Sequence, residues 1–303
     1  MNVPLVEKSK LDKILLRNKQ VGYQGVFFTL KLVEYQSLLK QCKNIHKKPT
    51  QEAKENSPPD EQEAREPNQT TEQFDRNRLF KPEYLLYNSP HLVDPYIAIH
   101  PDIQMVQELC EQHGLHYGIK ILVEESNEQK LLKTLQRTQK YRALLALQTE
   151  DQNCMLLGAR DSRIQILQLA TTRALATFDK GVLSLCRQHN TYVEIGLQLL
   201  LHAEQYERPK IMRRYSQFFS QLTFSKDKVI VGTHSNSEYD TRGVKGGEHL
   251  LKFLFGIPIA HSKDYFQNYC EELVAYYLLR VNDQLAEQGV LIYRVKMEES
   301  HND

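Results

Sequence analysis

Eight basic residues lie where their side chains could bind phosphate. They fall into three short stretches, namely GARDSRIQI, ERPKIMRRY and the loop within KVIVGTHSNSEYDTRGVKGGEHLL. These residues are Arg160, Arg163, Arg208, Lys210, Arg213, Arg214, Arg242 and Lys245. The planar fork of an arginine matches a phosphate group, and clusters of such residues suit an RNA backbone. A run of charge can equally be a solvated surface, so the pattern becomes informative only together with other features.

The loop after residues 229–231 is unusually polar for the end of a buried strand. It holds Ser, Asn, His, Arg and Gly before an amphipathic run that stops at Gly256. In a barrel of parallel strands, the loops that leave the carboxyl ends of the strands form the functional face, so we expect a site here. Gly246 and Gly247 either bring backbone amides near a phosphate at a helix N-terminus or only satisfy the geometry of a turn.

A metal-dependent hydrolase is the alternative that the strand ends allow. Its ligands would be His, Asp or Glu, and the candidates here are Glu124, Glu194 and His234. No HxH follows the first predicted strand, and HExxH, GxSxG and GxxxxGK[ST] motifs are absent from the sequence. We expect Glu194 to make an ion pair or a loop hydrogen bond and His234 to be a partly solvated loop residue. We therefore predict no catalytic residue and no metal ligand, and keep phosphoester hydrolysis through Glu194 and His234 as the alternative.

Composition limits the other classes of function. The net charge of +1 over 303 residues means that any binding of nucleic acid must depend on local basic patches. No apolar run approaches the roughly 18 residues needed to span a bilayer, and the first residues lack the apolar core of a signal peptide. We therefore expect an intracellular protein that does not bind membranes. The five cysteines are widely spaced and form no CxxC pair, which predicts buried, unpaired thiols.

One segment differs from the rest of the chain. Residues 43–78 are rich in Glu, Gln, Asn, Lys and Pro and nearly free of aliphatic side chains. Such a segment buries too little apolar surface to offset the entropy of ordering, so we predict a disordered insertion there. The remaining residues, 1–42 and 79–303, are predicted to form a single domain.

Within that domain, short apolar runs alternate with helical periodicity. The predicted strands are residues 25–30, 117–125, 143–148, 164–169, 191–197, 228–232 and 290–295. The predicted helices are residues 11–20, 103–113, 130–141, 178–187, 212–224 and 263–286. This alternation predicts a parallel α/β sheet with helices outside. Seven or eight strands without a glycine-rich dinucleotide loop after the first favour a TIM-type barrel over a doubly wound sheet.

Several of these motifs resemble a known family in the same order and spacing. The segment MNVP at residues 1–4 is similar to the end of the family's first strand, and Gly22-Tyr23 with GVFFTL resembles its second. GARDSRIQILQL, FDKGVLSLCRQHNTYVEI and MRRY resemble later strand entries and helix starts. The stretch from Tyr239 to Arg242, followed by a helix ending in LFGIP, completes the match. The family is the TIM-barrel protein subunit of ribonuclease P, called protein component 3 in archaea and related to a nuclear subunit in eukaryotes. Gln165 stands where the family usually has Asp.

The resemblance implies a binding subunit of a ribonucleoprotein. In this family the RNA subunit removes the 5′ leader of precursor tRNA, while the protein pairs with a small partner subunit, helps to position the RNA and needs no cofactor of its own. Ser235, Asn236 and Ser237 would then donate hydrogen bonds to RNA, with Arg242 as a phosphate fork. Arg160, Arg163, Arg213, Arg214 and Arg242 are expected to cluster on one side of the barrel. The implied location is the cytoplasm, or the nucleus in a eukaryote.

Overall fold

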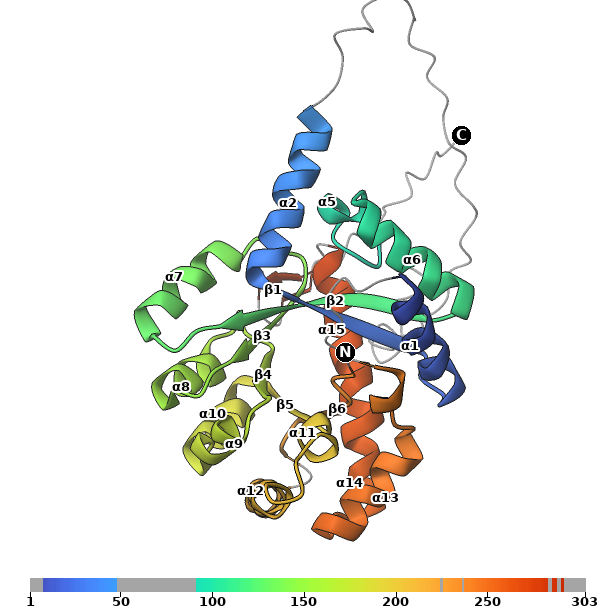
Figure 1. The fold of residues 1–303 in the computed structure, drawn as a ribbon. Coiled ribbons are helices and arrows are strands. Elements are labelled where there is room, and N and C mark those ends of the chain that lie inside the picture. The colour runs from blue at the N-terminus through green and yellow to red at the C-terminus, as the bar shows by residue number, and fades with distance from the viewer. Residues whose placement is uncertain are drawn as a thin grey trace, which may run out of the picture.

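A curved parallel sheet with helices along its outer side forms the centre of the protein. The computed structural model describes residues 8–47, 91–223, 226–235 and 237–282, together with the backbone of residues 285–287 and 290–291. Six strands pair in the order of the chain, and every neighbouring pair is parallel. The sheet curls as part of a barrel does (Figure 1), which confirms the predicted TIM-barrel-like α/β fold.

The six strands lie within two residues of their predicted positions. They are β1 Gly25–Lys31, β2 His116–Glu124, β3 Leu144–Gln148, β4 Ile166–Leu169, β5 Tyr192–Gly196 and β6 Val229–Gly232. Their apolar runs are buried on both faces, as expected of parallel strands covered on both sides. Because successive side chains point to opposite faces, the register of the sheet decides which residues meet inside the curve.

Helices cover the outer face of the sheet. They are α1 Lys8–Gln20, α2 Leu32–Lys47, α5 Pro95–Ala98, α6 Pro101–His113, α7 Glu128–Thr138, α8 Gln152–Arg160, α9 Thr172–Thr177, α10 Lys180–His189, α11 Gln198–Leu201, α12 Arg208–Gln221, α13 Val244–Phe255 and α14 Ile259–Lys263. Side-chain caps fix several starts, since Asp151, Thr171 and Asp179 each accept a hydrogen bond from a backbone N–H of the first turn. Gly114 and Gly256 end α6 and α13 in the left-handed conformation that glycine adopts readily.

One helix packs on the concave face. Helix α15, Tyr269–Val281, follows a π-helical turn at Asp264–Asn268 and crosses the inner side of the sheet (Figure 1). Its Leu273 and Tyr277 share an apolar cluster with Ala146 and Tyr192 of the strands. Helix α15 and the strands therefore form a hydrophobic core inside the curve of the sheet.

Three sequence expectations differ from the structure in whole or in part. Helix α2 runs to Lys47, so the first residues of the predicted insertion are helical, while residues 48–78 lie outside the described residues. The helix predicted to reach residue 286 ends at Val281, where the Asn282 amide donates to the carbonyl of Leu278 and competes with the helical bonds. Strand β8, Val290–Leu291, was expected to join the parallel series, but it pairs antiparallel with β7, Leu285–Glu287.

The cysteines behave as the sequence predicted. Cys42, Cys110, Cys154 and Cys186 are buried, Cys270 is half-buried, and all five are free thiols. Burial raises the pKa of the Cys110 thiol to about 12, and the thiols of Cys154, Cys186 and Cys270 respond in the same way. Among the described residues, no helix is both long and apolar enough to cross a membrane.

Candidate functional site

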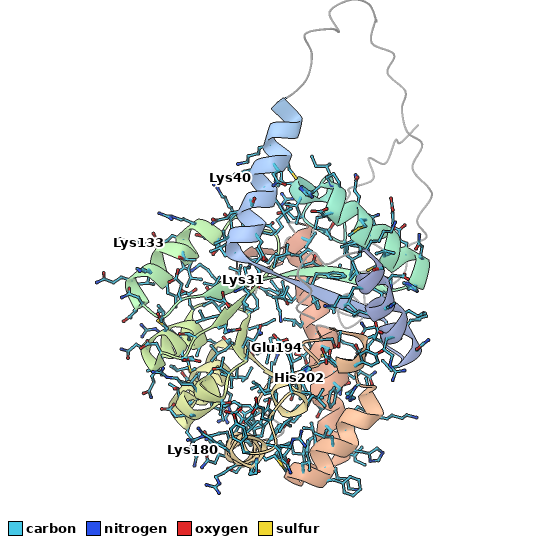
Figure 2. All side chains as sticks on the ribbon, viewed as in Figure 1. Lys31, Lys40, Lys133, Lys180, Glu194 and His202 are labelled. Atoms are coloured by element: carbon cyan, nitrogen blue, oxygen red, sulfur yellow. The ribbon has the colours of Figure 1, made fainter. Side chains whose placement is uncertain are left out.

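A buried ion pair lies inside the barrel, near the carboxyl ends of the strands. Lys120 of β2, Gln168 of β4 and Glu194 of β5 all point to the concave side. The Lys120 ammonium donates to both Glu194 oxygens at 2.9 and 2.7 Å and approaches Oε1 of Gln168 at 3.3 Å. The side chains of Lys120 and Glu194 are 3% and 8% exposed, so this pair is shielded from solvent. Figure 2 shows Glu194 within the curve of the sheet.

His234 completes this cluster from the loop after β6. Its Nε2 lies 2.8 Å from Oε1 of Glu194, and its backbone has a φ of 47°. Gly196 and Gly232 make room for the ring, since a Cβ added at these positions would lie 2.4 and 2.9 Å from imidazole atoms. His234 is 2% exposed, so the expectation of a partly solvated loop residue is wrong. The expectation that Glu194 makes an ion pair is confirmed.

The charges within this cluster balance. Burial acts to raise the pKa of Glu194, but Lys120 and His234 outweigh it, and the pKa of this carboxyl is held well below its usual range. Burial lowers the pKa of His234, with Glu194 opposing the shift in part. The arrangement is therefore an ammonium, a carboxylate and a neutral imidazole whose Nε2–H donates to the carboxylate.

The three candidate metal ligands do not converge. Both Glu194 oxygens already accept hydrogen bonds from Lys120, and one also accepts from His234. Glu124 instead makes an exposed ion pair with Lys31 at 2.9 Å. Within the described ranges, no group of three His, Cys, Asp or Glu residues is placed to hold a metal ion. The geometry therefore gives no support to the metal-dependent hydrolase alternative.

The loop between β6 and α13 is held by buried polar contacts. Ser235 is fully buried, donates to Oγ1 of Thr233 at 2.8 Å and accepts from Oγ1 of Thr241 at 3.1 Å. Asp240 is 4% exposed, accepts from the backbone N–H of Ser237 at 3.0 Å and pairs with His202 at 2.8 Å. Ser235 was predicted to donate to RNA, but its hydroxyl is used inside the loop. Asn236 lies outside the described residues, and Ser237 is half-buried.

Arg160 and Arg163 lie at the opposite edge of the sheet. Arg160 ends α8, whose Ala159 carbonyl accepts from Thr191 just before β5, at the amino ends of the strands. Arg163 makes a two-pronged ion pair with Asp161, at 2.8 Å from Nε and 2.5 Å from Nη2. The expectation that all the arginines cluster on one side is therefore wrong, because the strand direction places the residues that precede a strand opposite those that follow one.

The remaining basic residues gather near the carboxyl ends of the strands. Arg242 lies in the loop before α13, and the others lie on α12 and α13. These two helices pack together through Phe219 and Phe255, whose ring centroids are 5.0 Å apart. Arg208, Lys210 and Arg213 of α12 and Lys245 of α13 are exposed. Arg214 is half-buried and donates to Gln217, and Arg242 donates from Nη1 to the carbonyls of Tyr239 and Thr241.

Two features of this region were not foreseen from the sequence. Lys120 lies in the middle of the apolar strand HYGIKILVE. A charge buried at this position requires a partner, so the lysine itself was the sequence signal for a buried ion pair. Gln165 binds the backbone, because its side chain accepts from the N–H of Leu145 and donates to the carbonyl of Arg163.

The fold and the site together define a class of protein. The chain is a TIM-barrel-like α/β protein with a charge-balanced interior and with exposed basic residues on two neighbouring helices. Residues 87–282, more than half of the chain, match the family described as RNase P subunit p30, and the chain belongs to this family. It is accordingly a protein subunit of ribonuclease P, as the sequence resemblance implied.

One solved structure gives an independent comparison of the fold. The chain is similar to a chain of the structure titled "cryo-EM structure of archaeal Ribonuclease P with mature tRNA", with a TM-score of 0.62. The two share 13% sequence identity, and the match covers 98% of this chain and 99% of the other. No curated protein sequence matches the chain.

Proposed function

We propose that this subunit binds RNA within ribonuclease P and supports removal of the 5′ leader from precursor tRNA. The RNA subunit performs the hydrolysis, and the protein contributes no catalytic residue and needs no cofactor. Its partners are the ribonuclease P RNA, precursor tRNA and other protein subunits, including a small partner subunit. It acts in the cytoplasm, or in the nucleus if the source is eukaryotic.

The observation that carries this proposal is the exposed basic surface formed by α12 and α13. We call it the α12–α13 basic surface and define it by Arg208, Lys210, Arg213 and Lys245. Each of these side chains is exposed, and they lie on two helices that pack together. Phosphate contacts from such residues supply affinity and position without reading sequence. Membership in the p30 family and the solved archaeal complex with mature tRNA support the same assignment.

The other predicted RNA contacts have different roles in this proposal. Arg160 is exposed at the opposite edge of the sheet and would contact a separate part of the RNA. Arg163 and Arg214 already donate hydrogen bonds within the chain, so they would contribute positive charge rather than a two-pronged hydrogen bond to phosphate. Ser237 remains a candidate donor at the edge of the loop, as does Asn236, while Ser235 supports the loop from inside.

The test compares two triple variants of the complete protein. Arg208→Ala, Lys210→Ala and Arg213→Ala together remove the cations of α12. Lys130→Ala, Lys133→Ala and Arg137→Ala remove three exposed cations from α7 and serve as the control. Affinity for the ribonuclease P RNA is measured over a range of salt concentrations. The slope of log K against log salt should fall by about 0.9 for each phosphate that the variant no longer neutralises.

We expect the α12 variant to lower both the affinity and the salt slope, and the α7 variant to leave both close to those of the unmodified protein. Equal effects of the two triple variants would overturn the assignment of the basic surface. The complex purified from its own cells should also cleave precursor tRNA, and digestion of its RNA should abolish this activity. Cleavage that survives RNA digestion would contradict catalysis by the RNA subunit.

A further inference from the structure

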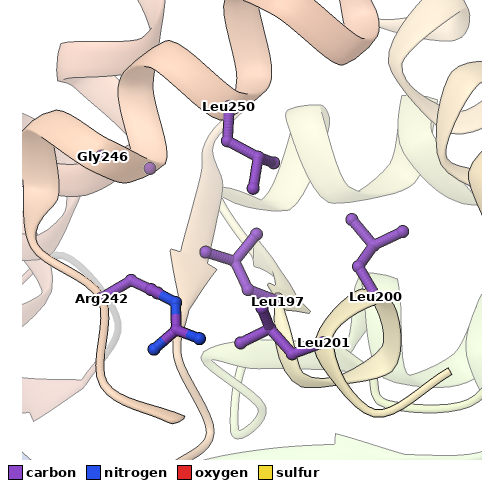
Figure 3. Close-up of a pocket in the computed structure, with 7 residues that line it drawn as sticks. Leu197, Leu200, Leu201, Arg242, Gly246 and Leu250 are labelled. Atoms are coloured by element: carbon purple, nitrogen blue, oxygen red, sulfur yellow. The ribbon is translucent and has the colours of Figure 1, made fainter. Parts of the chain in front are cut away.

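A small apolar pocket opens between α11 and α13, close to the β6 loop (Figure 3). Its volume is about 90 Å³. Four leucines and two glycines form its walls, and one arginine lies beside it. The lining residues are Leu197, Leu200, Leu201, Arg242, Gly246, Gly247 and Leu250.

The size and the chemistry of the pocket restrict what can occupy it. A cavity of about 150 Å³ holds benzene, whereas a water molecule needs only about 10–15 Å³ and several polar partners. The pocket falls between these limits at about 90 Å³ and is walled by aliphatic side chains. A nucleobase is at least as large as benzene and carries polar edges that the leucines cannot satisfy. A branched aliphatic side chain fits both the volume and the walls.

The part of the chain that includes Arg242 and the pocket residues of α13 also carries exposed apolar side chains. Five of the nine large apolar side chains exposed on the described residues lie between residues 206 and 259, and they are Tyr206, Tyr239, Phe253, Leu254 and Ile259. Tyr239 and Phe253 are 78% and 79% exposed. Tyr239 is joined to the pocket because its carbonyl accepts from Arg242. Aromatic residues and arginine are the residue types that carry most of the energy of protein interfaces.

Arg242 indicates the charge of the occupant. Its guanidinium lies beside the leucines of the pocket (Figure 3) and donates from Nη1 to the carbonyls of Tyr239 and Thr241. An arginine whose Nη1 is held in this way keeps its other guanidinium N–H groups in a fixed orientation. These groups can donate two parallel hydrogen bonds to a carboxylate. An apolar anchor with an acidic neighbour therefore complements this surface.

We propose that the pocket receives a branched aliphatic side chain of another protein subunit, next to an Asp or Glu that pairs with Arg242. This inference rests on the proposed function only in placing the partner within the same ribonucleoprotein. It assigns Arg242 to a protein contact, and the α12–α13 basic surface remains for RNA. The size of the pocket is what favours a protein over an RNA base here.

The test places a photoreactive leucine in the pocket wall of the complete protein. A diazirine analogue of leucine replaces Leu201, which is partly exposed, and the assembled complex is irradiated and digested. The same analogue at Leu132, 37% exposed on α7, is the control. We expect position 201, and not position 132, to be linked to a peptide of another subunit that holds an aliphatic residue beside an acidic one. The link should form with or without prior RNA digestion.

Two substitutions test the same contact by affinity. Gly246 lines the pocket, and a Cβ added there meets no atom within 4 Å, so Gly246→Leu adds bulk at the pocket wall without a clash, and Gly246→Ala is the matched control. Loss of a hot-spot anchor costs about 2 kcal/mol or more, so Gly246→Leu should weaken binding of the linked subunit by about 30-fold or more. Arg242→Glu should weaken it as well, and reversal of the acidic residue of the partner should restore it.

Any other result of the crosslinking and affinity experiments overturns the proposal. A link from position 201 to RNA, to a second copy of this chain or to another segment of the same chain would identify a different occupant. Lack of any link, together with unchanged affinity for Gly246→Leu, would show that the pocket is empty in the complex. The RNA content of the same sample is measured separately. A peptide link in a sample without RNA would support the pocket assignment while contradicting the proposed RNA function.

Discussion

Nε2 of His234 lies 2.8 Å from Oε1 of Glu194, although 40 positions separate the two residues in the sequence. The contact joins the β6 loop to the interior of the barrel, where Lys120 neutralises the same carboxylate. A loop residue that is fully buried at the mouth of a barrel fixes the start of that loop. The residues that follow, from Ser235 to Arg242, therefore begin from a defined position, which suits a surface that must present a binding site.

Breaking the buried ion pair should destabilise the protein strongly. Lys120→Met leaves the Glu194 carboxylate buried without its cation, and removal of one partner of such a pair typically costs about 3–5 kcal/mol. Lys31→Met is the control, because it breaks the solvent-exposed pair with Glu124 and should change the free energy of unfolding far less. Urea unfolding followed by circular dichroism measures both changes. Similar losses for the two variants would contradict the burial of the Lys120 pair.

Acid should weaken the fold through both Glu194 and His234. The pKa of Glu194 is lowered in the folded state, so its contribution is complete above about pH 4.3 and is lost as the pH falls further. The pKa of His234 is also lowered, so the unfolded chain takes up a proton first, below about pH 6.5, and stability already declines there.

Free energies of unfolding between about pH 7.5 and pH 3 measure this dependence. His234→Asn is a suitable comparison because Asn tolerates the left-handed backbone at this position. This variant should lose less stability between about pH 6.5 and pH 5, and it should keep the loss of stability that occurs at lower pH. A stability that rises between about pH 7 and pH 5 would contradict the lowered pKa values.

Replacing the glycine beside the His234 ring with a larger residue should destabilise the protein. A Cβ at Gly232 would lie 2.9 Å from Cδ2 of His234 and 3.1 Å from Oε1 of Glu194, so Gly232→Ala should lower the free energy of unfolding by about 1–3 kcal/mol. In the double variant Gly232→Ala with His234→Ala, the alanine at 232 should add a smaller further loss, because its contact with the ring is gone and only that with Glu194 remains. Gly246→Ala, in open space on α13, should be neutral or stabilising by up to about 1 kcal/mol. Thermal unfolding of these three variants and of His234→Ala alone distinguishes a local clash from a general effect of replacing glycine.

The thiols should react slowly in the folded protein. Burial raises the pKa of Cys270 to about 12, and the same holds for Cys110, Cys154 and Cys186. Since the thiolate is the reactive form, iodoacetamide at about pH 7.5 should label these positions only after addition of denaturant. Mass spectrometry of the labelled peptides measures this. Rapid labelling of Cys270, which is half-buried, would contradict the raised pKa of its thiol.

Much of the architecture could be predicted because its signals are local. The runs GVFFTL and TYVEIGL are short and apolar, and they became β1 and β5 at nearly the predicted positions. Asp151, Thr171 and Asp179 cap helices through hydrogen bonds to residues within the first turn. The end of the last long helix was less predictable, since α15 ends at Val281 and the prediction extended it to residue 286.

The sequence by itself determined the order of strands and helices, the buried thiols and the family, since each depends on residues close together in the chain. Only the tertiary structure decided which polar groups meet. Lys120 and Glu194 are 74 positions apart, and the register of the strands brings them within 2.7 Å. Strand direction likewise separated Arg160 and Arg163 from the α12–α13 basic surface. Contacts of this kind depend on which face each strand residue adopts and at which edge each loop emerges, and no local pattern of residues carries that information.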